Sequence, residues 1–166
     1  MRNVSLKLIL SYIMGVIVLV GLLVLLGSSQ TTGLETYQTD DASRPIAATE
    51  TTEFDFGTMT NQDIKSTKFN IRNNGQKDLA LTNVSTSCDC TYAYIRIGDA
   101  QSPKFTMHGT KAWTGSVPAE TSAELEVIYE PAIMPVQGHV SRTVTIATND
   151  PERPTLTFTI TANVTS

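Results

Sequence analysis

The C-terminal segment alternates strictly between apolar and polar residues, and this pattern limits the possible fold more than any other feature of the chain. The segment reads "TLTFTITANV" over residues 155–164, with threonine at most of the polar positions. Successive side chains of a β-strand point to opposite faces, so such alternation is typical of a half-buried strand. The apolar face consists of Leu156, Phe158, Ile160, Ala162 and Val164.

Several earlier segments repeat the pattern, and turn-forming sequences such as Asn73-Asn74-Gly75 and Asn149-Asp150-Pro151 separate them. No stretch after residue 30 shows a convincing helical period. The expected fold is all-β: an immunoglobulin-like antiparallel β-sandwich of about seven strands, with a small barrel as the alternative. The side chains expected in the core are Phe69, Ile71, Leu125, Val127, Val144, Ile146, Phe158 and Ile160.

The N-terminal segment has the features of a membrane anchor. Residues 8–26 carry no charge and are nearly all apolar. A helix of this length spans about 28 Å, close to the roughly 30 Å hydrocarbon core of a bilayer. Arg2 and Lys7 precede the segment and only acidic residues follow it closely, so the positive-inside rule places the C-terminal domain outside the cytoplasm. A cleaved signal peptide is the alternative interpretation.

The expected organisation has four parts. Residues 1–7 form a cytoplasmic N-terminus, 8–26 a transmembrane helix, 27–51 a flexible linker, and 52–166 the sandwich domain. The linker is rich in Thr, Ser, Gly, Asp and Ala and has no apolar periodicity. The expected location is therefore the cell membrane, with a single span and an extracytoplasmic domain.

Four short motifs carry a resemblance to a known family. They are "FDFG" at 54–57, "NNG" at 73–75, "SCDCT" at 87–91 and "TNDPERP" at 148–154. In this order they resemble the bacterial immunoglobulin-like family called domain of unknown function 1573, which is similar to sperm-protein-like and cilium-associated sandwich domains. The family usually has glycine between the two cysteines, where this chain has Asp89, and residues 98–117 resemble an insertion. The resemblance implies the fold and carries no established activity.

The sequence contains no set of residues typical of an enzyme. It has no nucleophile elbow and no phosphate-binding glycine loop, and its two histidines, His108 and His139, are far apart in the sequence. Beyond residue 27 there are ten basic and sixteen acidic residues, a net charge of −6, which disfavours nucleic acid. We therefore expect a non-enzymatic protein without a cofactor.

Cys88 and Cys90 are the only cysteines, and they leave several interpretations open. If their strand were continuous, they would lie outside, opposite a core face containing Ile95. Residues two apart on a strand are separated by about 6.6 Å, so a bond between them requires a turn or bulge at Asp89. The pair could be a local disulfide with a structural role. It could bind copper or zinc with His108, take part in thiol redox chemistry, or bond covalently to a partner.

Trp113, the only tryptophan, is a candidate for contact with a partner, although a lone tryptophan in such a loop more often packs over one end of a sandwich. The leading functional hypothesis is a membrane-anchored extracytoplasmic module for protein–protein interaction. Its partner would be another extracytoplasmic or membrane protein. The alternative is a metal-binding or thiol redox protein that uses Cys88 and Cys90.

Overall fold

The structure of the chain is a computed structural model that describes residues 10–17, 35–108 and 112–166. Residues 10–17 are helical, in a unit separate from the C-terminal domain. Among the described residues, no helix has both the length and the apolar character needed to cross a membrane. Most of the predicted anchor, residues 8–26, lies outside the described residues.

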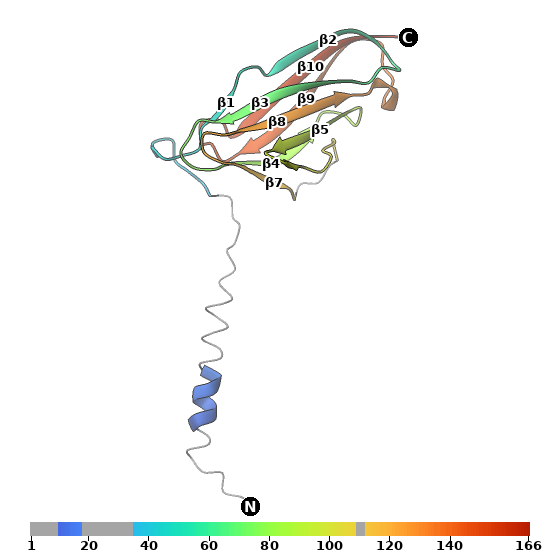
Figure 1. Cartoon of the computed structure of the whole chain (residues 1–166). Helices are drawn as coiled ribbons and strands as arrows, with labels where there is room; N and C mark the ends of the chain where they lie inside the picture. Colours follow the sequence, from blue (N-terminus) through green and yellow to red (C-terminus); the bar gives the residue numbers. More distant parts are fainter. Residues whose placement is uncertain (1–9, 18–34, 109–111) are drawn as a thin grey trace, which may run out of the picture. The chain divides into compact units, whose positions relative to one another are not determined.

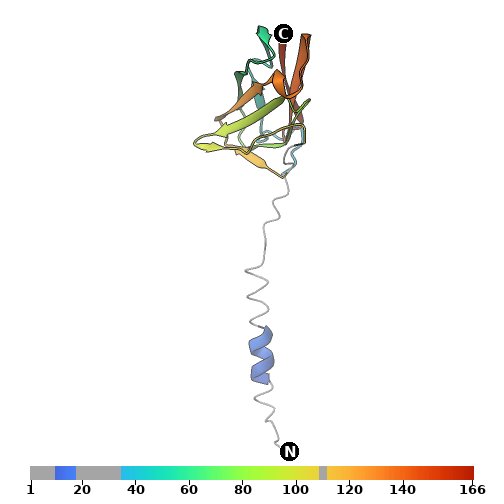
Figure 2. The same cartoon turned by 90° about the vertical axis from the view of Figure 1, so that its right-hand side faces the viewer.

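The domain consists of two five-stranded sheets that face each other (Figure 1). The turned view in Figure 2 separates the layer that carries β9 and β10 from the layer that carries β5. The first sheet has the order β1 (Ala47–Thr49), β3 (Lys65–Asn73), β8 (Ser122–Tyr129), β5 (Thr91–Ile97) and β6 (Ala100–Gln101). The second has the order β2 (Glu53–Thr60), β10 (Thr155–Thr165), β9 (Gly138–Thr148), β4 (Leu79–Thr86) and β7 (Thr114–Val117). A short 3₁₀ helix, η1 (Pro131–Ile133), connects β8 to β9.

The core lies between the two sheets and confirms the faces that were read from the alternation. Every side chain expected in the core is at most 2% exposed: Phe69, Ile71, Leu125, Val127, Val144, Ile146, Phe158 and Ile160. Phe69 of the first sheet contacts Phe158 of the second, with ring centroids 5.0 Å apart. The all-β fold class is thus confirmed, and the core joins residues about 90 positions apart in the sequence.

The details of the sandwich differ from the sequence prediction. Ten strands occur in the described residues instead of about seven, because β1, β6 and β7 are short edge strands. The β2–β10 pair is parallel, whereas the prediction was antiparallel throughout. Phe54 is 44% exposed, because β2 is an edge strand. Phe56 is partly buried against the core.

The "NNG" motif connects the segment before β1 to the body of the sandwich. The buried side chain of Asn73 accepts hydrogen bonds from the main-chain N–H groups of Ile46 and Gly75. Its amide donates to the carbonyl groups of Lys77 and Val117. A Cβ atom at Gly75 would lie 2.3 Å from a main-chain oxygen of the segment before β1, so only glycine fits there.

The "NDP" motif makes a second connection to the same segment. Asp150, 1% exposed, pairs with Arg44 at 2.9 Å and accepts the main-chain N–H of Ala47 at 2.9 Å. Arg44 also pairs with the exposed Glu152 at 2.8 Å. The ordered sandwich therefore reaches back to β1, into the range 27–51 that was expected to be linker. Composition does not reveal this, because the partners of the segment lie between 27 and 106 residues away in the sequence.

The free edge of β2 is occupied by a lysine. The ammonium group of Lys65 donates to the carbonyl oxygens of Phe56 at 2.9 Å and Thr58 at 3.1 Å. Between these two acceptors Gly57 has a φ of +65°, a backbone conformation that favours glycine. A lysine at an edge opposes pairing with a strand of another molecule, because docking would have to displace a charge. Lys65 therefore protects the free edge of β2 from pairing with a strand of another molecule.

The register places four connections at one end of the sandwich. Tyr129 lies opposite Lys65 on β3 and Thr91 on β5, and Val164 lies opposite Gly138. The segment before β1 enters at the other end, beside Asn73. We call the end away from that segment the distal end. It comprises residues 60–65, 87–91, 106–108, 129–138 and 164–166.

Candidate functional site

The two cysteines form a disulfide in a turn at the distal end, and β5 begins directly after it. Cys88 is 7% exposed and Cys90 is completely buried, so the expectation that they lie outside is wrong. The turn at Asp89 interrupts the alternation that would have carried them to the outer face. Within β5 the expectation holds, since Ala93 and Ile95 face the core.

The backbone of this turn is held by hydrogen bonds that do not involve sulfur. The Cys88 carbonyl accepts from the Thr86 hydroxyl at 2.9 Å and from the Thr91 N–H at 3.2 Å. The Cys90 carbonyl accepts the N–H of Glu130 at 2.9 Å, which connects the turn to the end of β8. The shape of the turn therefore rests mainly on neighbouring strands.

The structure adds an arginine to the site. Arg142 on β9 donates from Nε to the sulfur of Cys90 at 3.3 Å and from a terminal nitrogen to the carbonyl of Ser141. It occupies an inward position of β9, between the buried Val140 and Val144. Among the described residues, no carboxylate lies within salt-bridge distance of its guanidinium group. A half-buried positive charge thus faces the disulfide without a compensating anion.

Tyr129 at the end of β8 extends this polar interior. Its side chain is completely buried, and its hydroxyl makes no hydrogen bond of ordinary geometry with the rest of the described chain. Burial raises the pKa of Tyr129, and the nearby positive charge of Arg142 partly opposes that shift. The hydroxyl therefore stays protonated at neutral pH and remains a potential donor beside Arg142.

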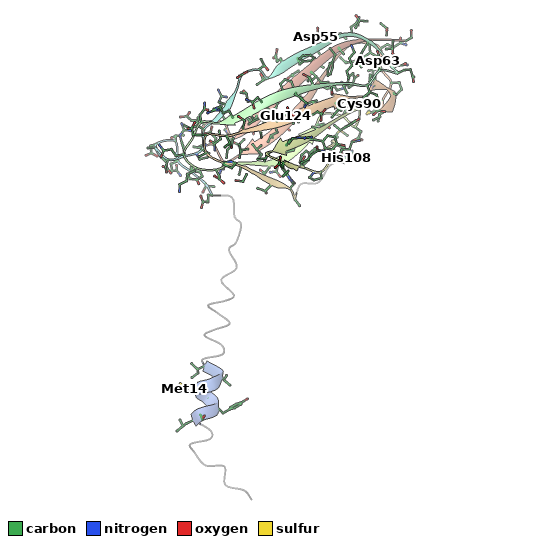
Figure 3. The ribbon with its side chains drawn as sticks, in the orientation of Figure 1. Met14, Asp55, Asp63, Cys90, His108 and Glu124 are labelled. Atoms are coloured by element: carbon green, nitrogen blue, oxygen red, sulfur yellow. A yellow bond between two sulfur atoms is a disulfide. The ribbon has the colours of Figure 1, made fainter. Side chains whose placement is uncertain are left out.

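Asp89 and His108 form the exposed rim of the site. Figure 3 labels His108 and Cys90. The His108 Nε2 atom lies 3.9 Å from a carboxylate oxygen of Asp89, and their side chains are 76% and 43% exposed. The structure thus brings His108 close to the cysteine turn, as the metal or redox hypothesis requires. Among the residues that the structure describes, however, no group of three or more His, Cys, Asp or Glu side chains is placed to hold a metal. Copper or zinc binding remains a prediction.

Trp113 lies away from the cysteine turn. Its ring contacts the buried Phe105, with centroids 5.1 Å apart at 65°, and covers Gly115 on β7. A Cβ atom at Gly115 would lie 2.3 Å from the indole, so glycine makes room for the ring. Trp113 also lines a groove of about 360 Å³ between the edges of β5 and β7, together with Ile95 and Ile97. Its role in contacting a partner remains a prediction.

Exposed apolar side chains gather in the loops of the distal end. Among the described residues of the domain, five large apolar side chains are more than a third exposed, and of these only Phe54 lies elsewhere. The other four are Ile64, Met107, Ile133 and Met134, with exposures between 41% and 60%. They belong to three different connections, which the register brings to one end of the domain. Clustered apolar exposure of this kind is typical of interaction surfaces.

Sequence reasoning missed Arg142, although the alternation contained a signal for it. In "VSRTVTI" every second residue falls on the same face of the strand, and this face carries Val140, Arg142, Val144 and Ile146. An arginine at a core-facing position is unusual, because a buried charge requires a partner. The same pattern places Tyr129 in line with Leu125 and Val127. A polar or charged residue on the apolar face of a strand is therefore the signal that could have revealed the site.

We expect the double substitution Cys88→Ser plus Cys90→Ser to fold and to lose less than about 2 kcal/mol of unfolding free energy. A bridge that closes so short a loop restricts the unfolded chain little, and the turn keeps its main-chain hydrogen bonds. Equilibrium denaturation of wild type and variant measures the difference, with reduced wild type as the control. Failure of the variant to fold would show that the bridge is a necessary structural element.

Residues 47–100 match the family model described as "Protein of unknown function (DUF1573)", which confirms the resemblance found in the sequence motifs. No curated protein matches the chain. A protein of unknown function from Porphyromonas gingivalis W83 has a TM-score of 0.58 at 18% identity. The match covers 78% of this chain and 52% of that one, so this chain spans about half of its length.

A second solved structure is the ASH / PapD-like domain 7 of human CEP192. It has a TM-score of 0.50 at 12% identity, with 83% of this chain and 96% of that domain covered. At these identities the likeness concerns the fold alone. The two-sheet architecture is thus found in a bacterial protein and in a human PapD-like domain.

Proposed function

Because residues 47–100 carry the DUF1573 pattern on a β-sandwich, we propose that this chain is a non-catalytic module for protein–protein interaction. The supporting observation is the cluster of exposed apolar side chains at the distal end. This cluster lies at the end of the domain away from the segment that leads into β1.

The strand edges favour contact through loops over strand addition. Lys65 protects the free edge of β2. The other edge strands are short: β1 has three residues, β6 has two and β7 has four. Strand addition needs a longer free edge. The partner we propose is therefore a second, different protein that presents an apolar surface to the distal loops.

We expect the combined substitution Ile64→Ser, Ile133→Ser and Met134→Ser to weaken partner capture at least about tenfold, because each apolar side chain buried on binding contributes more than about 1 kcal/mol. Capture is measured by crosslinking in native membranes followed by quantitative mass spectrometry. Phe54→Ser is the matched control, since Phe54 is similarly exposed but lies outside the distal end. Equal capture by the triple variant and wild type would contradict the proposal. Sedimentation distinguishes a different partner from a second copy of the chain.

We further propose that the apolar residues 8–26 tether the module to the membrane as an uncleaved anchor, with the sandwich on the extracytoplasmic side. Intact-mass measurement of membrane-extracted protein is expected to give the complete chain. A mass that begins near Gln30 would indicate a cleaved signal peptide and a released domain.

A further inference from the structure

We propose that the Cys88–Cys90 disulfide is a thiol–disulfide exchange site that accepts electrons from a dithiol protein, with Arg142 holding the Cys90 thiolate that is released. This role is separate from the interaction surface and does not depend on it. It uses three features of the distal interior: the turn, the guanidinium group and the difference in exposure between the residues Cys88 and Cys90.

Stabilisation of the fold does not account for the bridge. It closes a loop with a single intervening residue, and such short loops restrict the unfolded chain little. The main-chain carbonyls of the turn accept hydrogen bonds from the Thr86 hydroxyl and from the N–H groups of Thr91 and Glu130. The disulfide therefore occupies a protected position in which its contribution to folding is small.

Arg142 matches the reduced state of the pair better than the oxidised state. Its Nε donates to the Cys90 sulfur at 3.3 Å, and it has no carboxylate within salt-bridge distance in the described part of the chain. A guanidinium group interacts weakly with a neutral disulfide sulfur and strongly with a thiolate. The buried Tyr129 side chain lies near Arg142 and adds a second polar group to this interior. Breaking the disulfide would supply the anion that this interior lacks.

Exposure determines which sulfur atom is attacked. Cys88 keeps 7% of its surface accessible, whereas Cys90 has none and lies against Arg142. The attacking thiolate of the partner forms a bond to the Cys88 sulfur, and the bond between Cys88 and Cys90 breaks. The electron pair of that bond stays on Cys90 as a thiolate beside the guanidinium group.

The second half of the exchange completes the electron balance. The remaining thiol of the partner loses its proton and attacks the partner sulfur that is bonded to Cys88. The mixed disulfide breaks, and Cys88 leaves as a thiolate that takes up a proton. Overall, the partner dithiol is oxidised to a disulfide, and the Cys88–Cys90 pair is reduced by two electrons. A leaving thiol of lowered pKa makes the first step faster.

The first test maps the attack on the wild-type full-length chain in detergent. The chain is treated with the monothiol glutathione in the presence of iodoacetamide, which traps any released thiolate. Peptide mass spectrometry is expected to find glutathione on Cys88 and the alkyl group on Cys90. Glutathione mainly on Cys90, an equal mixture, or a bridge that reacts only after the domain unfolds would overturn the proposal.

The second test removes the positive charge from the site. In a dithiothreitol redox buffer, Arg142→Gln is expected to shift the equilibrium toward the disulfide about tenfold or more, as expected for the loss of a charge-assisted hydrogen bond. Alkylation of the reduced chain across pH provides a readout that a purely structural role would not change. Alkylation of the wild type should continue at lower pH than alkylation of the variant, because Arg142 stabilises the thiolate that reacts.

The matched control is Arg96→Gln, an exposed arginine of β5 that donates only to Gln101 within the described chain. It is expected to leave both the equilibrium and the alkylation profile within about twofold of wild type. Circular dichroism verifies that each variant is folded. An Arg142→Gln variant that is folded but unchanged in both readouts would overturn the proposal. The map of adducts on the wild-type chain tests the proposal even if the variant does not fold.

Discussion

Phe158→Ala is expected to lower the free energy of unfolding by about 3 to 5 kcal/mol. Phe158 lies on the inward face of β10, is 1% exposed and contacts Phe69 of the opposite sheet at a centroid distance of 5.0 Å. Truncation removes a large apolar surface from both sheets and leaves a cavity that β-strands cannot easily close. Equilibrium unfolding in urea, followed by fluorescence and circular dichroism, measures the loss.

The control for this substitution is its neighbour Thr157, which is exposed on the outer face of the same strand. Thr157→Ala is expected to change the unfolding free energy by no more than about 0.5 kcal/mol. A loss below about 1 kcal/mol for Phe158→Ala would mean that the wrong face of β10 has been assigned to the core. Similar losses for both variants would point to an effect of strand propensity instead of core packing.

Asp150→Ala is expected to destabilise the domain by about 3 kcal/mol, because it removes one partner of a buried ion pair. The Asp150 carboxylate is 1% exposed, pairs with Arg44 and accepts the main-chain N–H of Ala47. Its loss leaves a half-compensated guanidinium group and a buried N–H without an acceptor. The expected structural result is release of β1 from β3, visible as faster amide hydrogen exchange in residues 44–49.

Glu152→Ala is the matched control for Asp150→Ala. Glu152 contacts the same arginine at 2.8 Å, but its side chain is 58% exposed, so the pair is screened by water. We expect a loss of no more than about 1 kcal/mol and unchanged exchange in residues 44–49. Equal losses for the two variants would show that burial does not distinguish the two pairs.

The fold class and the core could be predicted from the sequence because alternation is a local property. A residue such as Val144 or Phe158 faces the core for the same reason as its second neighbour, whatever strand lies beside it. The family motifs could also be recognised in the sequence, and the structure explains why two of them are present. Asn73 accepts the N–H of Ile46, just before β1, and Asp150 accepts the N–H of Ala47, the first residue of β1.

The details of the site depended on contacts between residues far apart in the sequence. Arg142 reaches Cys90 across 52 residues, and Arg44 reaches Asp150 across 106. No local pattern encodes such a distance, so the sequence did not pair Arg142 with Cys90 and assigned Arg44 to a linker. The protection of the β2 edge by Lys65 likewise depends on a tertiary contact, because Lys65 donates to the carbonyls of Phe56 and Thr58 on another strand.

By itself, the sequence determined which faces are apolar, which family the domain resembles, and which few residues could carry thiol or metal chemistry. The tertiary structure decided that the cysteines are bonded and buried, that Arg142 faces them, and that His108 stands at their rim. The physical reason is that periodicity fixes the direction of a side chain relative to its own strand. The neighbours that it meets are fixed by the register and order of strands from distant parts of the chain.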